Sequence, residues 1–409
     1  MKLLQVDTIE ETKKKIDQYF KDIQAKSEEV SLIYAGGRIL GEDIYAPFDI
    51  PEFNRSTVDG YAVCSKDTFG VSESLPVFLD VIGNVEMGEE AKQSIKSGQA
   101  VYVPTGGMIP QGADAVIMIE HVENLDEQTI AVYHPVAPGE NRIVQGEDFK
   151  KEQLMLEKGR RLGPQDIGAL AAMGISKVSV FQRPKVAIIS TGDEIVSPSE
   201  EIAIGQIRDI NTYSLGALIE EFGGQITKRL LVKDCYNILK DRLESVLEDN
   251  DIILLSGGSS VGFKDMTAKV IDSLGEPGAF VHGVAVKPGK PTIIGKIKDT
   301  AVFGLPGHPV SAMIVCRIFV GHLIKNMLSM EKLKEVQREA ICLENIHSAP
   351  GKETYQMVEI KEKGESIYVK PVYGKSGAIS TLTRADGFIK IGTNQEGVNK
   401  GDKVIVTLL

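Results

Sequence analysis

Apolar residues between positions 184 and 328 form two patterns that follow one another along the chain. Short continuous runs, as in KVAIIS at 185–190 and DIILLSGG at 251–258, are typical of strands buried on both faces. Between the runs lie segments with helical spacing, such as NTYSLGALIEEFGG at 211–224, which we expect Asn211 to cap and Gly223 to end. Strands that alternate with helices predict an α/β domain with a parallel sheet.

Polar segments follow three of these predicted strands. They are STGDE at 190–194, SGGSSVG at 256–262 and GLPGHP at 304–309. Ligands of open parallel sheets bind outside the carboxyl ends of the strands. The sequence therefore predicts a ligand site at this edge of the sheet.

The rest of the chain carries shorter patterns. Residues 7–30 have helical spacing, and Asp7 and Thr8 suit the start of a helix. From about 75 to 142 apolar runs alternate with turn residues, which predicts a small β domain. PQDIGALAAMGISKVSVF at 164–181 predicts a helix followed by a strand, and residues 335–409 are strand-rich. The expected fold is a multidomain α/β and β chain, with small mixed and β domains beside the parallel-sheet domain.

Composition narrows the functional class. The net charge of -11 argues against a nucleic-acid binder, which needs a basic face. The four cysteines lie far apart, which favours neither a disulfide framework nor a zinc site and fits a reducing, cytoplasmic compartment. The N-terminus lacks the apolar core of a signal peptide. The apolar stretch Pro309 to Leu328 contains Arg317, His322 and Lys325, so we interpret it as a buried helix and expect no membrane contact.

Three motifs of the α/β segment suit an anionic ligand. Asp193 and Glu194 follow a buried strand, where they can bind Mg²⁺ or accept hydrogen bonds, although a helix cap or solvated loop is the simpler alternative. SGGSSVGFKD at 256–265 is dense in N–H and hydroxyl donors and ends on Asp265, which favours phosphate binding over a plain chain reversal. KPGKP at 287–291 holds two lysines in a stiff turn, either as an oxyanion clamp or as a solvated loop.

Two motifs of the first half are weaker when taken alone. NRSTVDGYAV at 54–63 crowds polar residues around Asp59, and PTGG at 104–107 can offer backbone N–H groups to an anion. Taken alone, each is better explained as a glycine turn. The segment GKSG at 374–377 is no P-loop, since the earlier glycine would fall at Val369, and no G-x-S-x-G nucleophile motif occurs.

Taken in order, these segments resemble the molybdopterin molybdenumtransferase family, which includes the C-terminal part of gephyrin. NRSTVDGYA, PTGGMIPQGADAV, NRIVQGEDF, STGDEI, GQIRDIN, SGGSSVGFKD, KPGKP and GLPGHPVSA all appear in family order. The resemblance covers essentially the whole chain. It implies a discontinuous mixed domain of residues 1–48 and 143–177, an inserted β domain at 49–142, a pterin-binding α/β domain at 178–328 and a C-terminal β domain at 329–409.

The resemblance further implies a reaction. Adenylyl-molybdopterin and molybdate, as substrates, give molybdenum cofactor and AMP with the help of Mg²⁺. It implies a homodimer that makes transient contact with the molybdopterin adenylyltransferase of the preceding step. Because both substrates are anionic, lysines and Mg²⁺ would offset their repulsion.

The resemblance and the motifs above give the candidate residues. Catalytic roles fall to Asp59, Glu194, Asp265 and Lys287, with the metal on Glu194 and Asp265. The substrate-binding candidates are Thr105, Asp148, Asp193, Asp234, Ser256, Gly257, Gly258, Ser259, Pro288, Lys290 and Pro291.

The sequence departs from the family pattern at three positions. His308 stands where the family often has Asn, and Arg208 stands where a tyrosine is common, adding an expected anion contact. Arg142 comes one residue earlier than the usual arginine.

Two alternative functions stay open at this point. The first is the molybdopterin adenylyltransferase itself, which the segment around Asp59 disfavours because the stand-alone enzyme has no such part. The second is a non-catalytic scaffold or binding protein, which the retention of every carboxylate-bearing motif disfavours.

Overall fold

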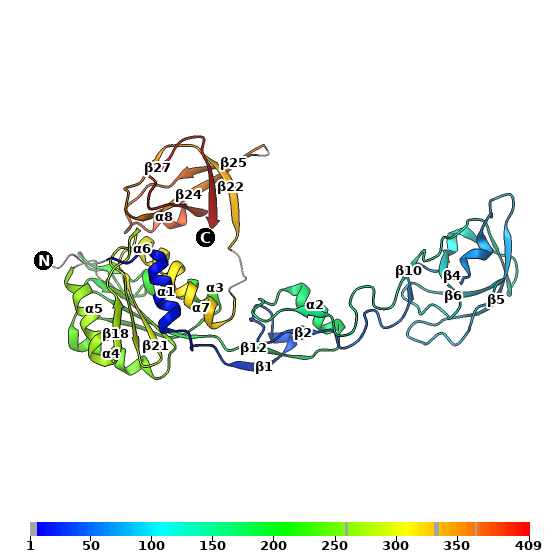
Figure 1. Cartoon of the computed structure of the whole chain (residues 1–409), viewed down its shortest axis with the longest axis horizontal. Coiled ribbons are helices and arrows are strands. Elements are labelled where there is room, and N and C mark those ends of the chain that lie inside the picture. Colours follow the sequence, from blue (N-terminus) through cyan, green and yellow to red (C-terminus); the bar gives the residue numbers. More distant parts are fainter. Residues whose placement is uncertain (1–5, 258–260, 331–334, 365) are drawn as a thin grey trace. The chain divides into compact units, whose positions relative to one another are not determined.

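The computed structural model describes residues 6–257, 261–330, 335–364 and 366–409 (Figure 1). The chain forms two compact units. Unit 1 comprises Met1–Glu42, Lys158–Gly163 and Lys177–Leu409, and unit 2 comprises Asp43–Glu157 and Pro164–Ser176. The finer division into four domains stays a prediction.

The α/β part of unit 1 contains a six-stranded sheet in the order β16-β13-β17-β21-β20-β18. The first four strands are parallel, and β20 and β18 are antiparallel additions. The strands are β13 (Lys185–Thr191), β16 (Gln225–Val232), β17 (Ile252–Gly257), β18 (Pro277–Val281), β20 (Ile293–Ile297) and β21 (Thr300–Pro306). The helices between them are α3 (Asn211–Phe222), α4 (Tyr236–Leu247) and α5 (Val261–Leu274). The predicted alternation of strands and helices is confirmed.

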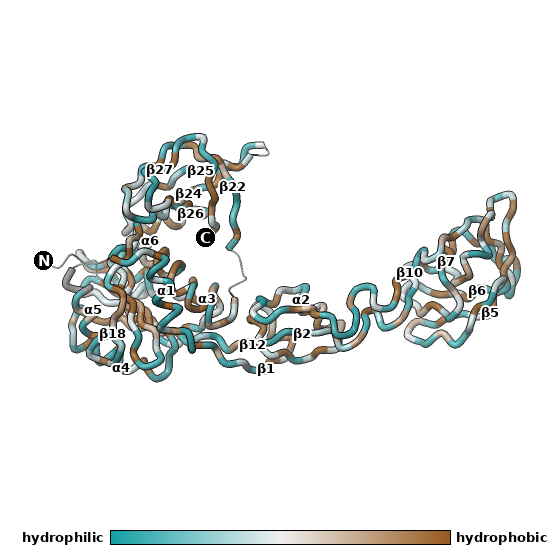
Figure 2. Tube along the Cα trace, viewed as in Figure 1, coloured by the Kyte–Doolittle hydropathy of each residue, from teal (hydrophilic) through white to brown (hydrophobic). Residues whose placement is uncertain are grey.

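Helices cover both faces of this sheet because successive residues of each buried strand point to opposite sides. Val186 and Ile188 of β13 belong to a core with residues of α1 (Ile9–Tyr19), α3 and the 309–327 helix. Ala187 and Ile189 belong to a second core with residues of α4 and α5. Hydrophobic residues accordingly gather along the strands in Figure 2. The domain therefore has three layers, and the carboxyl ends of its four parallel strands lie along one edge of the sheet.

One long helix follows β21. It consists of α6 (Pro309–Val315), the π-helical segment Cys316–Val320 and α7 (Gly321–Met327). Its length and composition alone would suit a membrane span, but 72% of its most apolar window is buried inside the protein. It is a core helix, as the charged residues within the stretch predicted.

The N-terminal helix is shorter than predicted. Thr8 caps α1 because its Oγ1 accepts a hydrogen bond from the backbone N–H of Glu11 at 3.2 Å, and the Glu11 carboxylate accepts from the Thr8 N–H at 2.8 Å. The helix ends at Tyr19, and the predicted continuation to residue 30 is wrong, because Ser27–Ser31 is strand β1, paired with β12 (Lys177–Phe181). Ile9 and Ile16 are buried in the α/β core, which explains the apolar spacing.

The C-terminal part of unit 1 is the predicted β domain. Its sheet has the order β19-β24-β25-β22-β28-β26, and a further β24–β26 pairing joins the sheet back on itself. The elements are β19 (Val286–Lys287), β22 (Gln337–Cys342), β23 (Ile346–His347), β24 (Glu353–Lys363), β25 (Ser366–Pro371), α8 (Ser380–Thr383), β26 (Gly387–Ile391), β27 (Gly397–Val398) and β28 (Lys403–Leu408). Strand β19 comes from the α/β segment and pairs with β24, so it ties the KPGKP loop to this sheet.

Unit 2 holds the other predicted β domain, with the sheet order β7-β4-β6-β5-β9-β8. The strands are β4 (Gly60–Val63), β5 (Val77–Asn84), β6 (Gln99–Val103), β7 (Ala115–Met118), β8 (Val122–Asn124) and β9 (Thr129–Val132). The short pairs β3 (Arg55–Ser56) with β10 (Arg142–Ile143), and β2 (Ile44–Tyr45) with β11 (Leu154–Leu156), lead into and out of it. Helix α2 (Pro164–Ala172) also belongs to unit 2.

Candidate active site

The predicted ligand edge of the α/β sheet carries a pocket. Strands β13, β17 and β21 are parallel neighbours, so the segments that follow them meet at one edge. The pocket has a volume of about 240 Å³. It is lined by Ser190, Glu194, Ile195, Ile207, Arg208, Asp209, Ile210, Asn211, Ser256, Gly257, Gly307, His308, Pro309 and Gly377. Glu194, Ser256 and Gly257 are thus brought together as the sequence predicts.

A buried polar network supports one wall of the pocket. The Asp209 carboxylate, whose residue is 8% exposed, accepts hydrogen bonds at Oδ1 from Ser190 Oγ at 3.2 Å and from the Thr212 N–H at 3.1 Å. Ser190 Oγ also lies 2.8 Å from Thr212 Oγ1. Buried polar groups that satisfy one another in this way hold a fixed geometry. Sequence reasoning missed Asp209, whose position just before an apolar helix resembles an ordinary cap.

The structure gives Asn211 a role different from the helix cap that the sequence predicts. Asn211 is the first residue of α3, and the N-cap is the preceding residue, Ile210. Its side-chain Nδ2 donates to Ser256 Oγ at 2.7 Å and to the Gly307 carbonyl at 2.8 Å. The side chain therefore links α3 to the loops after β17 and β21. Gly223 does end the helix as predicted, in the left-handed conformation at φ 97°.

Three carboxylates gather beside the pocket. Burial raises the pKa of Asp234, and the negative charges of Asp193 and Glu194 raise it further. Glu194 lines the pocket, while Asp193 and Asp234 are exposed next to it. Neighbouring carboxylates whose charges repel one another favour binding of a proton or a cation. Across the part of the chain that the structure describes, no group of three or more His, Cys, Asp or Glu side chains is placed to enclose a metal ion.

Arg208 and His308, two of the residues that depart from the family pattern, also line the pocket. Arg208 donates through Nε to the Pro198 carbonyl at 3.1 Å and through Nη2 to the Glu200 carbonyl at 3.4 Å. These bonds stabilise the arm, residues 197–206, which connects β14 (Ile195–Val196) with β15 (Ile207–Arg208). His308 Nδ1 lies 2.8 Å from Ser376 Oγ. Gly377, which follows Ser376 in the C-terminal β domain, also lines the pocket.

The remaining α/β candidates lie outside the pocket lining. Asp265 is exposed on α5, which starts at Val261, so it does not end a loop as predicted. Gly258 and Ser259 lie outside the described residues. Lys287 and Lys290 are exposed; Pro288 lies between them, and Pro291 follows Lys290. Gly289 is required there, since an added Cβ would lie 2.4 Å from Val315 Cγ2.

We expect Lys287→Ala to weaken binding of the anionic substrate about ten- to a hundredfold. A charge-assisted hydrogen bond contributes roughly 1.5–3 kcal/mol, which corresponds to that range. Titration calorimetry of the full chain measures the change. Lys269→Ala, which removes an exposed lysine on α5, is the control and should leave affinity unchanged. Equal affinities for wild type and Lys287→Ala would identify Lys287 as a solvated turn residue.

Unit 2 brings together two other candidates. The Asp59 carboxylate accepts at Oδ1 from the Thr105 N–H at 2.7 Å and from Thr105 Oγ1 at 3.1 Å. The two loops also exchange backbone hydrogen bonds, from Ser56 N to Gly107 O at 3.0 Å and from Gly106 N to Ser56 O at 2.8 Å. Both residues are exposed, so this pair presents a hydroxyl and a carboxylate to solvent. Asp148 is exposed, and its backbone N–H donates to the Ile50 carbonyl at 3.0 Å.

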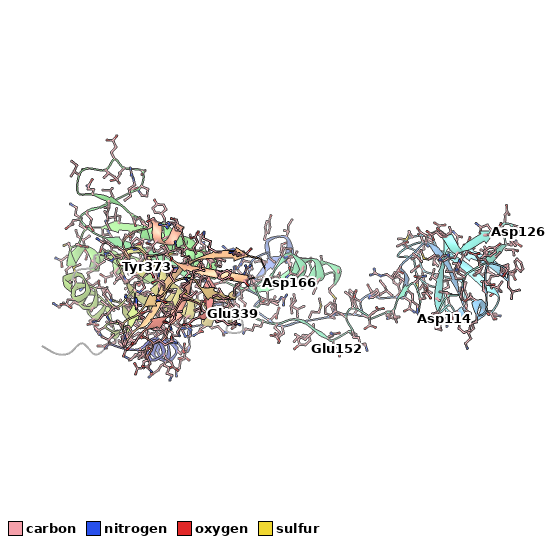
Figure 3. All side chains as sticks on the ribbon, turned by 90° about the horizontal axis from the view of Figure 1, so that it is seen from above. Asp114, Asp126, Glu152, Asp166, Glu339 and Tyr373 are labelled. Carbon is pink, nitrogen blue, oxygen red and sulfur yellow. The ribbon has the colours of Figure 1, made fainter. Side chains whose placement is uncertain are left out.

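Arg142 contributes to the electrostatic environment of Asp114 in unit 2. Burial alone would raise the pKa of Asp114, but hydrogen bonds from Ser65 and the charge of Arg142 bring it below its usual value. Asp114, labelled in Figure 3, accepts from the Ser65 N–H at 2.6 Å and from Ser65 Oγ at 2.8 Å. This environment gives Arg142 a stabilising role within the β domain.

Three protein-family models match segments that together cover most of the chain. Residues 7–174 match the model "MoeA N-terminal region (domain I and II)", residues 187–326 match "Probable molybdopterin binding domain", and residues 339–409 match "MoeA C-terminal region (domain IV)". The chain is 32% identical to a molybdopterin molybdenumtransferase of Haemophilus influenzae over 384 residues, which cover 93% of each chain. The corresponding protein of Staphylococcus epidermidis is 29% identical over 94% of this chain and 92% of its own.

Solved structures give the same result for the fold. The crystal structure of a molybdopterin biosynthesis MoeA protein from Pyrococcus horikoshii is 41% identical, with a TM-score of 0.84 and coverage of 99% of both chains. A second structure of a MoeA protein from the same organism also has a TM-score of 0.84, with 36% identity and coverage of 99% and 100%.

Proposed function

Because the chain belongs to the molybdopterin molybdenumtransferase family, we propose that it transfers molybdenum from molybdate to adenylyl-molybdopterin with release of AMP. A transferase role in molybdenum cofactor biosynthesis follows from the family itself. The observation that carries the finer proposal is the pocket at the strand ends. Glu194, Ser256 and Gly257 line it within the segment that matches a molybdopterin-binding model.

The residues around the pocket fit Mg²⁺ in one particular manner. They do not form an all-protein cage, but Mg²⁺ in phosphate-handling enzymes is usually held by one or two carboxylates together with waters and substrate phosphates. Glu194, with Asp193 and Asp234 beside it, supplies such carboxylates. Bound Mg²⁺ would neutralise charge on the phosphate oxygens.

The protein's own groups then have distinct tasks. We assign Ser256 and Gly257, which line the pocket, to binding of the pterin or its phosphate. Lys287 and Lys290 supply positive charge toward anionic substrate groups in a chain with a net charge of -11. We assign Asp265, Asp59 and Thr105 to the same reaction from the family motifs, as groups that position substrate.

The proposal extends to the surroundings of the enzyme. We expect a homodimer in the cytoplasm that receives adenylyl-molybdopterin in a transient contact with the adenylyltransferase. The adenylyltransferase alternative is not favoured, because the MoeA-type N-terminal and C-terminal regions are both present. The family assignment likewise favours a transferase over a scaffold.

Release of AMP should depend on molybdate. In the proposed reaction, cleavage of the adenylyl group is coupled to metal insertion, so an incubation of the full chain with adenylyl-molybdopterin and Mg²⁺ alone should yield little AMP. Added molybdate should raise the rate of AMP formation, measured by chromatography. Sulfate, an oxyanion of similar shape, is the control. An AMP rate that is the same with no oxyanion would remove the coupling from the proposal, and consumption of ATP with free molybdopterin would favour the adenylyltransferase.

A further inference from the structure

A larger cavity of unit 1 lies between the α/β core and the C-terminal β domain. Its volume of about 880 Å³ falls within the range of roughly 300–1,000 Å³ that is typical of small-molecule sites. Lys13 of α1 and Lys325 of α7 line it from the side of the α/β core, and Lys390 of β26 lines it from the C-terminal domain. Among the described residues, this cavity and the candidate active site share no lining residue.

The walls of this cavity belong to packed parts of the protein. Phe388 of β26 and Met357 of β24 lie in the same buried core as Ile16 of α1 and Phe319 of the 309–327 helix. Phe388 also lines the cavity, so the cavity opens directly on this core. A continuous hydrophobic core therefore joins the two domains beside the charged side chains.

Most of the cationic side chains that line the cavity have an acidic partner. Lys325 Nζ lies 3.5 Å from Glu335 Oε1, and Lys390 Nζ lies 2.8 Å from Glu353 Oε2. The other pairs are Arg317 with Glu221, Lys403 with Glu339 and His322 with Asp17. Because a partner offsets each of these charges, the pairs by themselves predict no ligand.

Lys13 has a different environment. Burial lowers the pKa of its ammonium group, and the positive charges of Lys390 and Lys325 lower it further. The attraction of Glu335 and Glu353 opposes this shift but does not cancel it. Both carboxylates are already paired with other lysines, so three ammonium groups share two carboxylates at this point. An added anion would offset the remaining positive charge.

We propose that this cavity binds a phosphate group, either free or carried by a small metabolite, on Lys13, Lys325 and Lys390. A phosphate monoester carries about -1.5 to -2 charges at pH 7 and three acceptor oxygens, so it can accept from several ammonium groups at once. Lysine binds phosphate as a point charge and needs no fixed fork geometry. The cavity has room for the rest of a molecule of nucleotide size. The site goes beyond the proposed transferase reaction, which uses none of these three lysines.

Lys13→Met tests the site, because methionine keeps an unbranched apolar stem and removes the ammonium group. Inorganic phosphate and AMP are titrated into the full chain by calorimetry, at an ionic strength of about 0.15 M that screens weak surface attraction. Wild type should bind both, and Lys13→Met should bind both roughly ten- to a hundredfold more weakly. Lys14→Met, at the next and exposed residue of α1, is the matched control and should keep wild-type affinity. Tighter binding of AMP than of phosphate would identify a phosphate ester as the ligand, and the reverse order free phosphate.

The candidate active site is itself expected to bind anions, so its share is measured separately. In a Lys287→Ala background, Lys13→Met should still weaken the binding of phosphate and AMP by the same factor. Since a ligand of the folded state raises the thermal midpoint, phosphate should also raise the midpoint of wild type and Lys14→Met more than that of Lys13→Met. If wild type binds neither anion, or Lys13→Met binds both as tightly as wild type, the inference is overturned. If affinity falls in Lys287→Ala and not in Lys13→Met, the anions bind at the candidate active site alone, and the inference is wrong while the proposed function stands.

Discussion

Glu194→Gln is expected to lower the turnover of the full chain at least about a hundredfold, with little change in thermal stability. Glu194 lines the pocket at the carboxyl end of β13, and it is exposed, so the fold does not depend on it. Glutamine keeps the shape but removes the charge that we assign to Mg²⁺. A hundredfold loss corresponds to about 2.7 kcal/mol, within the several kcal/mol that a metal ion contributes to charge stabilisation.

The dependence on Mg²⁺ distinguishes a metal ligand from a merely acidic neighbour. In Glu194→Gln, rising Mg²⁺ should restore part of the AMP rate, with half-saturation shifted to higher concentration. Glu200→Gln is the matched control, since Glu200 is an exposed glutamate on the same arm and does not line the pocket. If both variants keep wild-type turnover and the same Mg²⁺ half-saturation, Glu194 plays no part in metal binding.

The α/β site shows what the sequence can and cannot predict. Segments after buried parallel strands must meet at one edge, so Glu194, Ser256 and Gly257 could be placed together from the apolar runs alone. Asn211 could not, because its position before an apolar helix is also that of a cap. Its actual partners, Ser256 and Gly307, are 45 and 96 positions away along the chain. Only the register of β17 and β21 brings these distant groups to one side chain.

The predicted end of the N-terminal helix is wrong for a related reason. Its capping box at Thr8 and Glu11 is a local signal and was predictable. Its end at Tyr19 is not, since the residues that follow pair as β1 with β12, about 150 positions further on. Asp265 is a similar case, because the donor-rich spacing of 256–265 suggested one continuous loop, while α5 starts at Val261. Periodicity reports local preference, and tertiary pairing decides where an element stops.

Gly60→Ala should destabilise unit 2 by about 3 kcal/mol or more and lower its thermal midpoint by roughly 10 °C. A Cβ at Gly60 would lie 1.9 Å from the carbonyl oxygen of Ile117 and 2.8 Å from its carbon. Both belong to the backbone of β7, which pairs with β4 on one side while β6 pairs on the other. The strands would have to separate, because no rotamer change can relieve a clash with backbone. Gly60 therefore follows Asp59 for a steric reason, and the close pairing of β4 holds Asp59 beside Thr105.

Gly168→Ala is the matched control within the same unit. Gly168 lies in α2, where an added Cβ meets nothing within 4 Å, so the change should be neutral or stabilise by up to about 1 kcal/mol through helix propensity. Calorimetry of the full chain gives the midpoints, and hydrogen exchange of residues 60–63 and 115–118 assigns the loss to β4 and β7. In Gly60→Ala those peptides should exchange faster, while peptides of β13 and β17 in unit 1 should keep wild-type protection. An unchanged midpoint with full protection of β4 would mean that the strands accommodate a methyl group, and the steric account of the Asp59-Gly60 pair would then be wrong.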